Sequence, residues 1–95
     1  MAITFHIPAY LAGFADGQRS LTLASSPATV SEALDALWHL HPALRDRILD
    51  EQGEVRQHIN VFVGEESIRF AQGLATTVQD KSEILIVPAV SGGAV

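Results

Sequence analysis

The chain has 95 residues, which is long enough for one small domain with a single modest core. Hydrophobic residues make up 47% of it and are spread along its length, as is typical of a globular rather than a disordered protein. It contains no cysteine, which excludes disulfides, thiolate metal sites and a cysteine nucleophile. The net charge of −5 argues against nucleic-acid binding, because phosphate contacts require clustered cations.

The beginning of the chain, MAITFHIPAY, lacks the basic start and apolar run of a signal peptide. No apolar stretch approaches the length that spans a membrane. We therefore expect a cytoplasmic protein that binds neither membrane nor nucleic acid. Its acidic balance suits a protein partner with a basic docking surface.

The first predicted element is a strand, because apolar residues alternate over 3–7 until Pro8 interrupts them. Asp16 and Gly17 then supply turn chemistry. Alternation resumes over 20–24, so the two segments are expected to form a hairpin with a rather long loop.

The clearest predicted helix starts at Thr29, which forms a Thr-x-x-Glu capping box with Glu32. Pro42 marks its end. An apolar stripe of helical period follows the cap, formed by Val30, Ala33, Leu34, Leu37 and Trp38 or Leu40. One or two further helical turns are expected after Pro42, with Leu44, Ile48 and Leu49 pointing inward.

A second hairpin is expected over 58–70, with its turn at 64–66. Residues 73–82 form a short helical or irregular connection, and 83–90 form a final strand. The order β-β-α-β-β-β indicates an α+β protein of the β-grasp, or ubiquitin-like, architecture, in which a mixed sheet packs on one main helix. We expect a single domain over 1–90 and a flexible tail over 91–95.

No enzyme site is expected. The four histidines do not combine with carboxylates at metal-ligand spacing, and no Gly-x-Ser-x-Gly elbow presents a nucleophile. The glycine pairs do not join a strand to a helix as a phosphate loop does. The sequence therefore predicts no catalytic residue, no metal and no cofactor.

The tail is the best candidate for a functional segment. Pro88 cannot donate an amide to the sheet, so the residues that follow it are expected to leave the sheet. Gly92 and Gly93 lack a Cβ, and with Ser91 they can thread a narrow channel in a partner enzyme. The alternative is a frayed end without a function.

Residues 59–93 resemble the second half of the ubiquitin-like sulfur carriers of the MoaD and ThiS type, especially the branch that serves cysteine synthesis. The resemblance lies in a strand-turn-strand, the segment Gly73-Leu74-Ala75-Thr76, a polar turn at 79–82, and the run from Ile86 to Gly93. Residues 1–55 agree only in the order and length of the elements.

The resemblance implies that the protein is a cosubstrate and not a catalyst. In such carriers an E1-like enzyme uses ATP to adenylate the carboxylate of the terminal glycine, and a sulfur donor then displaces AMP and leaves a thiocarboxylate. A sulfur-accepting synthase takes that sulfur into its product. Gly93 matches the acyl glycine and Gly92 the neighbour that threads the channel.

The sequence departs from this family at Ala94 and Val95, because most such carriers stop at the second glycine. With the dipeptide attached, Gly93 has no free carboxylate. We hypothesise a precursor from which a peptidase, of the zinc-dependent deubiquitinase-like (JAMM) type, removes Ala94-Val95.

A docking patch follows from strand alternation. If Ile84 and Ile86 face the helix, Leu85 and Val87 face outward. In the neighbouring hairpin Val61 and Val63 would then face inward. Phe62 would join Leu85 and Val87 in an exposed apolar patch that binds the partner enzymes. The alternative is that this face is buried, within the fold or in an oligomer.

Three other functions remain open from the sequence. The chain could be the small subunit of molybdopterin synthase, which would form a stable complex with a catalytic subunit. It could be a ubiquitin-like protein modifier, which would leave Gly93 joined to target lysines. It could also be a β-grasp interaction module with an inert tail.

Overall fold

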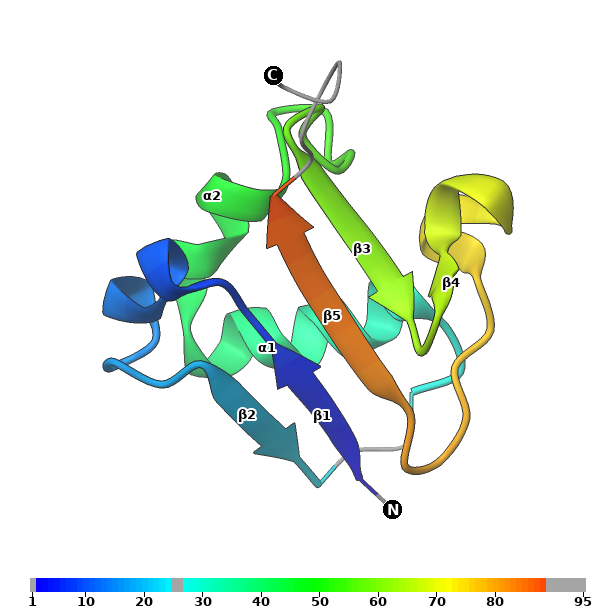
Figure 1. Cartoon of the computed structure of the whole chain (residues 1–95), viewed down its shortest axis with the longest axis horizontal. Helices are drawn as coiled ribbons and strands as arrows, with labels where there is room; N and C mark the ends of the chain where they lie inside the picture. The colour runs from blue at the N-terminus through cyan, green and yellow to red at the C-terminus, as the bar shows by residue number, and fades with distance from the viewer. Residues whose placement is uncertain (1, 25–26, 89–95) are drawn as a thin grey trace.

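The computed structural model describes residues 2–24 and 27–88. One five-stranded mixed sheet packs with one face on helix α1, and the shorter α2 lies on the same side (Figure 1). The strands are β1 (Ile3–His6), β2 (Ser20–Leu23), β3 (Ile59–Val63), β4 (Glu66–Ser67) and β5 (Glu83–Pro88), and the α-helices are α1 (Val30–Leu40) and α2 (Arg45–Ile48). The predicted α+β, β-grasp fold is confirmed.

The strand order in the sheet is β2-β1-β5-β3-β4. Strand β5 lies at the centre, parallel to β1 and antiparallel to β3. The two hairpins, β1-β2 and β3-β4, flank it and are both antiparallel. Since β5 ends at Pro88, the C-terminal segment 89–95, which includes the predicted tail 91–95, follows directly on the middle strand of the sheet.

Helix α1 begins as the capping box predicts. The Thr29 hydroxyl accepts a hydrogen bond from the Glu32 amide at 3.3 Å, and the Glu32 carboxylate accepts one from the Ala28 amide at 3.0 Å. Four residues of the predicted stripe are buried, namely Val30, Ala33, Leu34 and Leu37. Trp38 is half-buried at the edge of the core, and Leu40 is exposed.

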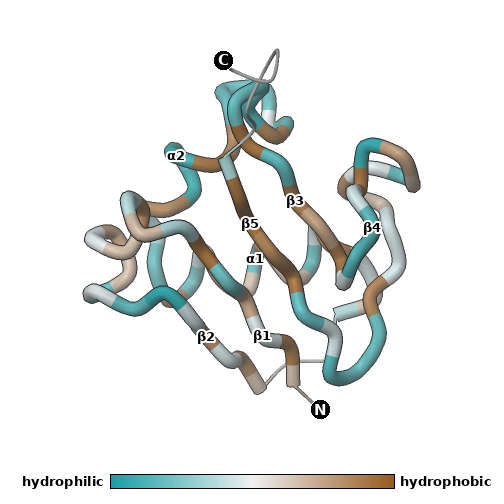
Figure 2. The backbone as a smooth tube through the Cα atoms, in the orientation of Figure 1, coloured by the Kyte–Doolittle hydropathy of each residue, from teal (hydrophilic) through white to brown (hydrophobic). Residues whose placement is uncertain are grey.

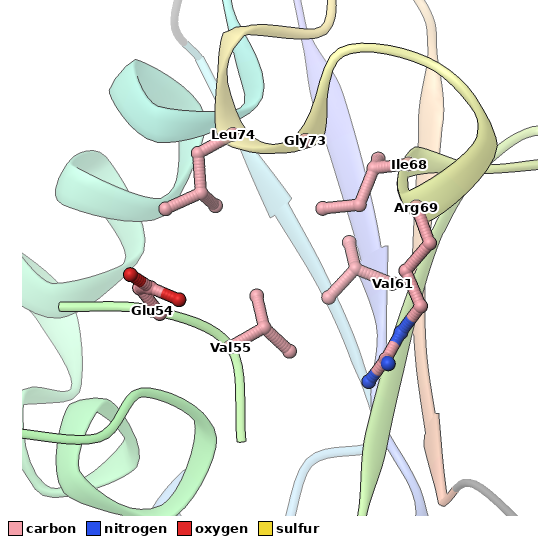
Figure 3. Close-up of a pocket in the computed structure, with 7 residues that line it drawn as sticks. All are labelled: Glu54, Val55, Val61, Ile68, Arg69, Gly73 and Leu74. Atoms are coloured by element: carbon pink, nitrogen blue, oxygen red, sulfur yellow. The ribbon is translucent and has the colours of Figure 1, made fainter. Parts of the chain in front are cut away.

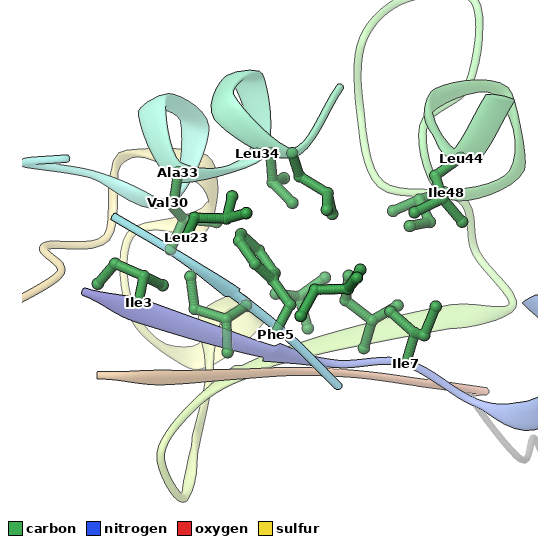
Figure 4. Packing of buried hydrophobic residues seen from close by; sticks show 14 of the residues in the cluster. Ile3, Phe5, Ile7, Leu23, Val30, Ala33, Leu34, Leu44 and Ile48 are labelled. Carbon is green, nitrogen blue, oxygen red and sulfur yellow. The ribbon is translucent and has the colours of Figure 1, made fainter. Parts of the chain in front are cut away.

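The core lies between α1 and the sheet. Figure 4 shows Phe5 pointing from β1 toward α1. Phe5 is fully buried, and so are Ile84 and Ile86 of the neighbouring strand β5. Burying apolar surface stabilises the fold by about 25 cal/mol per Å², and this is the main favourable contribution in such a core.

Helical turns connect the main elements. The segment after Pro42 folds into a 3-10 turn (Pro42–Leu44) and α2, as expected. The loop of the first hairpin holds an unpredicted 3-10 helix, Ala9–Phe14, because Leu11 turns inward and its amide bonds to the Pro8 carbonyl at 3.0 Å.

The second hairpin is shorter than the expected 58–70. Strand β4 ends at Ser67, and residues Ile68–Phe70 form a 3-10 turn. The Ser67 hydroxyl accepts a hydrogen bond from the Arg69 amide at 3.3 Å and so caps this turn. A second 3-10 turn, Gly73–Ala75, begins the connection to β5.

Within the described ranges, no helix has the length and apolar character needed to cross a bilayer.

Candidate functional site

The open face of the sheet is the side turned away from α1 and toward the viewer in Figure 1. Leu85 and Val87 of β5 lie on it, because their neighbours Ile84 and Ile86 point into the core. Phe62 of β3 stands opposite Leu85 in the antiparallel register and shares this face.

These three residues, which we call the Phe62 patch, are all half-buried. The predicted inward neighbours Val61 and Val63 are buried and half-buried respectively, and both contact the core. The structure therefore brings Phe62, Leu85 and Val87 together on one apolar surface of the central strands. Brown segments in Figure 2 mark apolar residues along β5 and β3, both those that face the core and those that face outward.

A polar network borders the patch, and the sequence did not single it out. His6 Nε2 lies 2.8 Å from Glu83 Oε1, and His6 Nδ1 lies 3.2 Å from the Ser20 hydroxyl. The three side chains link β2, β1 and β5. Strand alternation was the available signal, since Phe5 and Ile7 point inward and place His6 outward.

This network resembles a Ser-His-Glu arrangement only in its connectivity. The side chain of His6 is 39% exposed and that of Glu83 is 62% exposed, so water screens their attraction. We infer that the network holds the three strands in register beside the patch, and we give it no catalytic role.

The predicted tail residues Ser91, Gly92, Gly93, Ala94 and Val95 lie outside the described residues. The structure does define where the tail starts. Pro88, the last residue of β5, stands opposite Ile59, the first residue of β3. The C-terminal segment therefore starts where β5 ends and β3 begins, next to Val87 of the Phe62 patch.

Among residues 2–24 and 27–88, no group of three or more histidine and acidic side chains is placed to hold a metal ion.

A pocket that the sequence did not predict opens between two turns on the other side of β3. Its walls are the turn before β3 and the segment between β4 and β5 (Figure 3). It is lined by residues of four separate segments, namely Glu54, Val55, Val61, Ile68, Arg69, Gly73 and Leu74. Since those segments are separate in the sequence, no local sequence pattern predicts the pocket.

Comparison with known proteins decides between the families that share this fold. The sequence model of the ThiS family matches residues 6–93, nearly the whole chain. The chain belongs to the ThiS family. The match includes both glycines of the tail and ends at Gly93.

One similar protein is the sulfur carrier protein CysO of Mycobacterium tuberculosis, which is 32% identical over 95 residues and covers 98% of this chain and 100% of its own. Its crystal structure superposes with a TM-score of 0.83 and covers 93% of this chain and 99% of that one. The chain is therefore a relative of this sulfur carrier over its full length.

Two further relatives extend the comparison. Small archaeal modifier protein 1 of Haloferax volcanii is 47% identical over 66 residues, which cover 70% of this chain and 71% of its own. A chain in the crystal structure of the BexX/CysO complex of Amycolatopsis orientalis is 34% identical, with a TM-score of 0.83 and coverage of 96% and 99%. The relatives thus include sulfur carriers and a protein named as a modifier.

Proposed function

We propose that this protein is a sulfur carrier that works through Gly93, in the synthesis of cysteine or of another sulfur-containing metabolite. The observation that supports this most is the match of the ThiS family model through Gly93, together with full-length similarity to CysO. The carrier supplies an acyl group and a recognition surface, while partner enzymes supply the catalysis.

The chemistry requires a free carboxylate at Gly93. In this chain the Gly93 carbonyl is in a peptide bond to Ala94, so the first step is hydrolysis of that bond by a peptidase. A zinc peptidase of the JAMM type is the proposed enzyme. It adds water across the amide, which leaves the Gly93 carboxylate and releases the residues that follow.

Activation then occurs on an E1-like partner. The carboxylate attacks the α-phosphate of ATP, pyrophosphate leaves, and an acyl adenylate forms. A hydrosulfide ion attacks the acyl carbon, displaces AMP and loses its proton, which gives the thiocarboxylate. Glycine is suited to this position because the missing side chain leaves the carbonyl accessible in a narrow channel.

The Phe62 patch is the proposed docking surface for these partners. Val87 is six residues before Gly93, so an extended segment between them reaches about 20 Å. A partner that binds the patch therefore has the reactive glycine within about 20 Å of Val87. An apolar patch near the root of a tail is the kind of surface that a protein partner covers.

Removal of the dipeptide is expected to make the carrier independent of the peptidase. A variant ending at Gly93 should gain a thiocarboxylate when incubated with the adenylating enzyme of its own organism, ATP and sulfide. The 95-residue chain should gain none until the peptidase is added. Intact-mass spectrometry measures both, and a Gly93→Val variant of the shortened chain serves as the unreactive control.

Equal thiolation of the 95-residue chain and the shortened chain without the peptidase would contradict the processing step. Failure of the shortened chain to react at all would contradict the carrier role.

A second candidate function is protein modification. It is favoured by the 47% identity to small archaeal modifier protein 1. In that case activated Gly93 would be attacked by a lysine amine of a target and form an isopeptide bond. Target peptides that carry a C-terminal fragment of this chain on a lysine would distinguish this function from sulfur transfer.

A further inference from the structure

Side chain to backbone hydrogen bonds span both walls of the pocket beside β3. In the turn before β3, the Asp50 carboxylate accepts hydrogen bonds from the amides of Gln52 and Glu54 at 2.9 and 3.0 Å. In the opposite wall, the buried Thr76 hydroxyl donates to the Gly73 carbonyl at 2.6 Å and accepts from the Gln72 amide at 3.1 Å. Both turns are thus held by side chain to backbone bonds, and the space between them is built into the fold.

The pocket has an apolar floor and polar sides. Its volume is about 360 Å³, near the small end of ligand-binding pockets. Figure 3 shows Glu54 on one side and Arg69 on the other. The apolar side chains between them are those of Val55, Val61, Ile68 and Leu74. This pattern fits a short apolar stretch of polypeptide, whose side chains need the floor and whose backbone needs donors and acceptors.

Arg69 has donors to spare. Its Nη2 donates to the Ile59 carbonyl at 2.8 Å and makes longer contacts with the carbonyls of Arg56 and Gln57. In the described part of the chain no carboxylate lies within 4.0 Å of it. A guanidinium has five N–H donors, so several remain for carbonyl oxygens of a bound peptide.

The root of the tail lies beside this pocket. Arg69 contacts the carbonyl of Ile59, and Ile59 stands opposite Pro88, the last residue before the tail. Residues 89–95 span up to about 24 Å when extended, at about 3.4 Å per residue. Only the start of β3 separates Pro88 from Arg69, so the tail is long enough to cross it and enter the pocket.

We propose that this pocket binds the tail's own Ala94-Val95 segment. The Val95 and Ala94 side chains lie on the apolar floor, and the spare Arg69 donors bind backbone carbonyl oxygens of the segment. Glu54, across the pocket, accepts from its amides. Docking sequesters the bond between Gly93 and Ala94 before any chemistry at Gly93, and it does not require that chemistry.

Tethering makes a weak contact sufficient. A short flexible linker holds its end at an effective concentration in the millimolar range. A dipeptide that binds such a pocket with a millimolar dissociation constant would therefore be docked for a substantial fraction of the time. Free peptide would bind only at comparable concentration.

NMR spectroscopy tests the docking directly. The methyl signals of Val55, Ile68 and Leu74 are expected to differ between the 95-residue chain and a chain ending at Gly93. The differences should be independent of protein concentration, because the tail binds within its own molecule. Arg69→Gln should remove most of them, and Arg47→Gln, which changes an arginine over the Phe14 ring, should not.

A Val95→Asp variant provides a second check that leaves Arg69 and the folded domain intact. It places a charge on the apolar floor and should give the pocket signals of the shortened chain. Identical pocket signals in the 95-residue and shortened chains would overturn the proposal. So would differences that vanish on dilution, since those would show binding between copies. Neither result depends on sulfur chemistry, so both leave the function of Gly93 to be judged separately.

Discussion

Phe62→Asp is expected to weaken binding to the adenylating enzyme about 30-fold or more and to leave the fold intact. Phe62 lies opposite Leu85 on the open face, half-buried and apart from the core beneath the sheet. Losing an aromatic anchor at the centre of an interface costs about 2 kcal/mol or more, and each 1.4 kcal/mol is tenfold in affinity. A charge at this position adds a desolvation cost in the complex and little in the free protein.

Calorimetric titration of the purified adenylating enzyme with the Phe62→Asp variant measures the loss of affinity. Thermal unfolding of the variant measures its stability. Thr22→Asp is the matched control. Thr22 is exposed on the edge strand β2, which β1 and β5 separate from Phe62 on β3. Unchanged affinity of the Phe62 variant would place the docking surface elsewhere. A large drop in its melting temperature would show that Phe62 belongs to the core.

Phe5→Ala is expected to destabilise the fold by about 3–5 kcal/mol, the cost of removing a large aromatic from a packed core. Phe5 is fully buried and lies in β1, between Leu21 of β2 and Ile84 of β5 in the register. Small domains have a total stability of about 5–15 kcal/mol, so this change removes a large part of it. Urea unfolding followed by circular dichroism measures the loss.

The same substitution at Phe70 is the control. Phe70 is 87% exposed in the 3-10 turn after β4, so Phe70→Ala should change the free energy of unfolding by less than about 0.5 kcal/mol. Equal losses at Phe5 and Phe70 would contradict the packing described for the core.

The local elements could be predicted because short-range chemistry determines them. The Thr29–Glu32 capping box predicted the start of α1 to the residue, and alternation predicted which residues of β3 and β5 face the helix. The order of the strands is different in kind. The parallel pairing of β1 with β5 joins residues about eighty positions apart, and the sequence indicated only a mixed sheet without saying which strands pair.

The features that were missed arise from tertiary contacts. The 3-10 helix Ala9–Phe14 forms because Leu11 is drawn into the core from a segment that looks like a loop. The pocket needs the turn before β3 and the segment after β4 to lie side by side, and Arg69 stabilises this by binding carbonyls ten to thirteen residues away. The alternation that indicated the Phe62 patch carries no information on either feature.

The central claim is that Gly93 is freed and then carries sulfur. The intact mass of the protein, purified without a C-terminal tag from its own organism, tests it most directly. We expect a species that ends at Gly93, part of which carries one sulfur in place of one oxygen. A protein that retains Ala94 and Val95 under every sulfur supply would contradict the account, because Gly93 would then never have a carboxylate to activate.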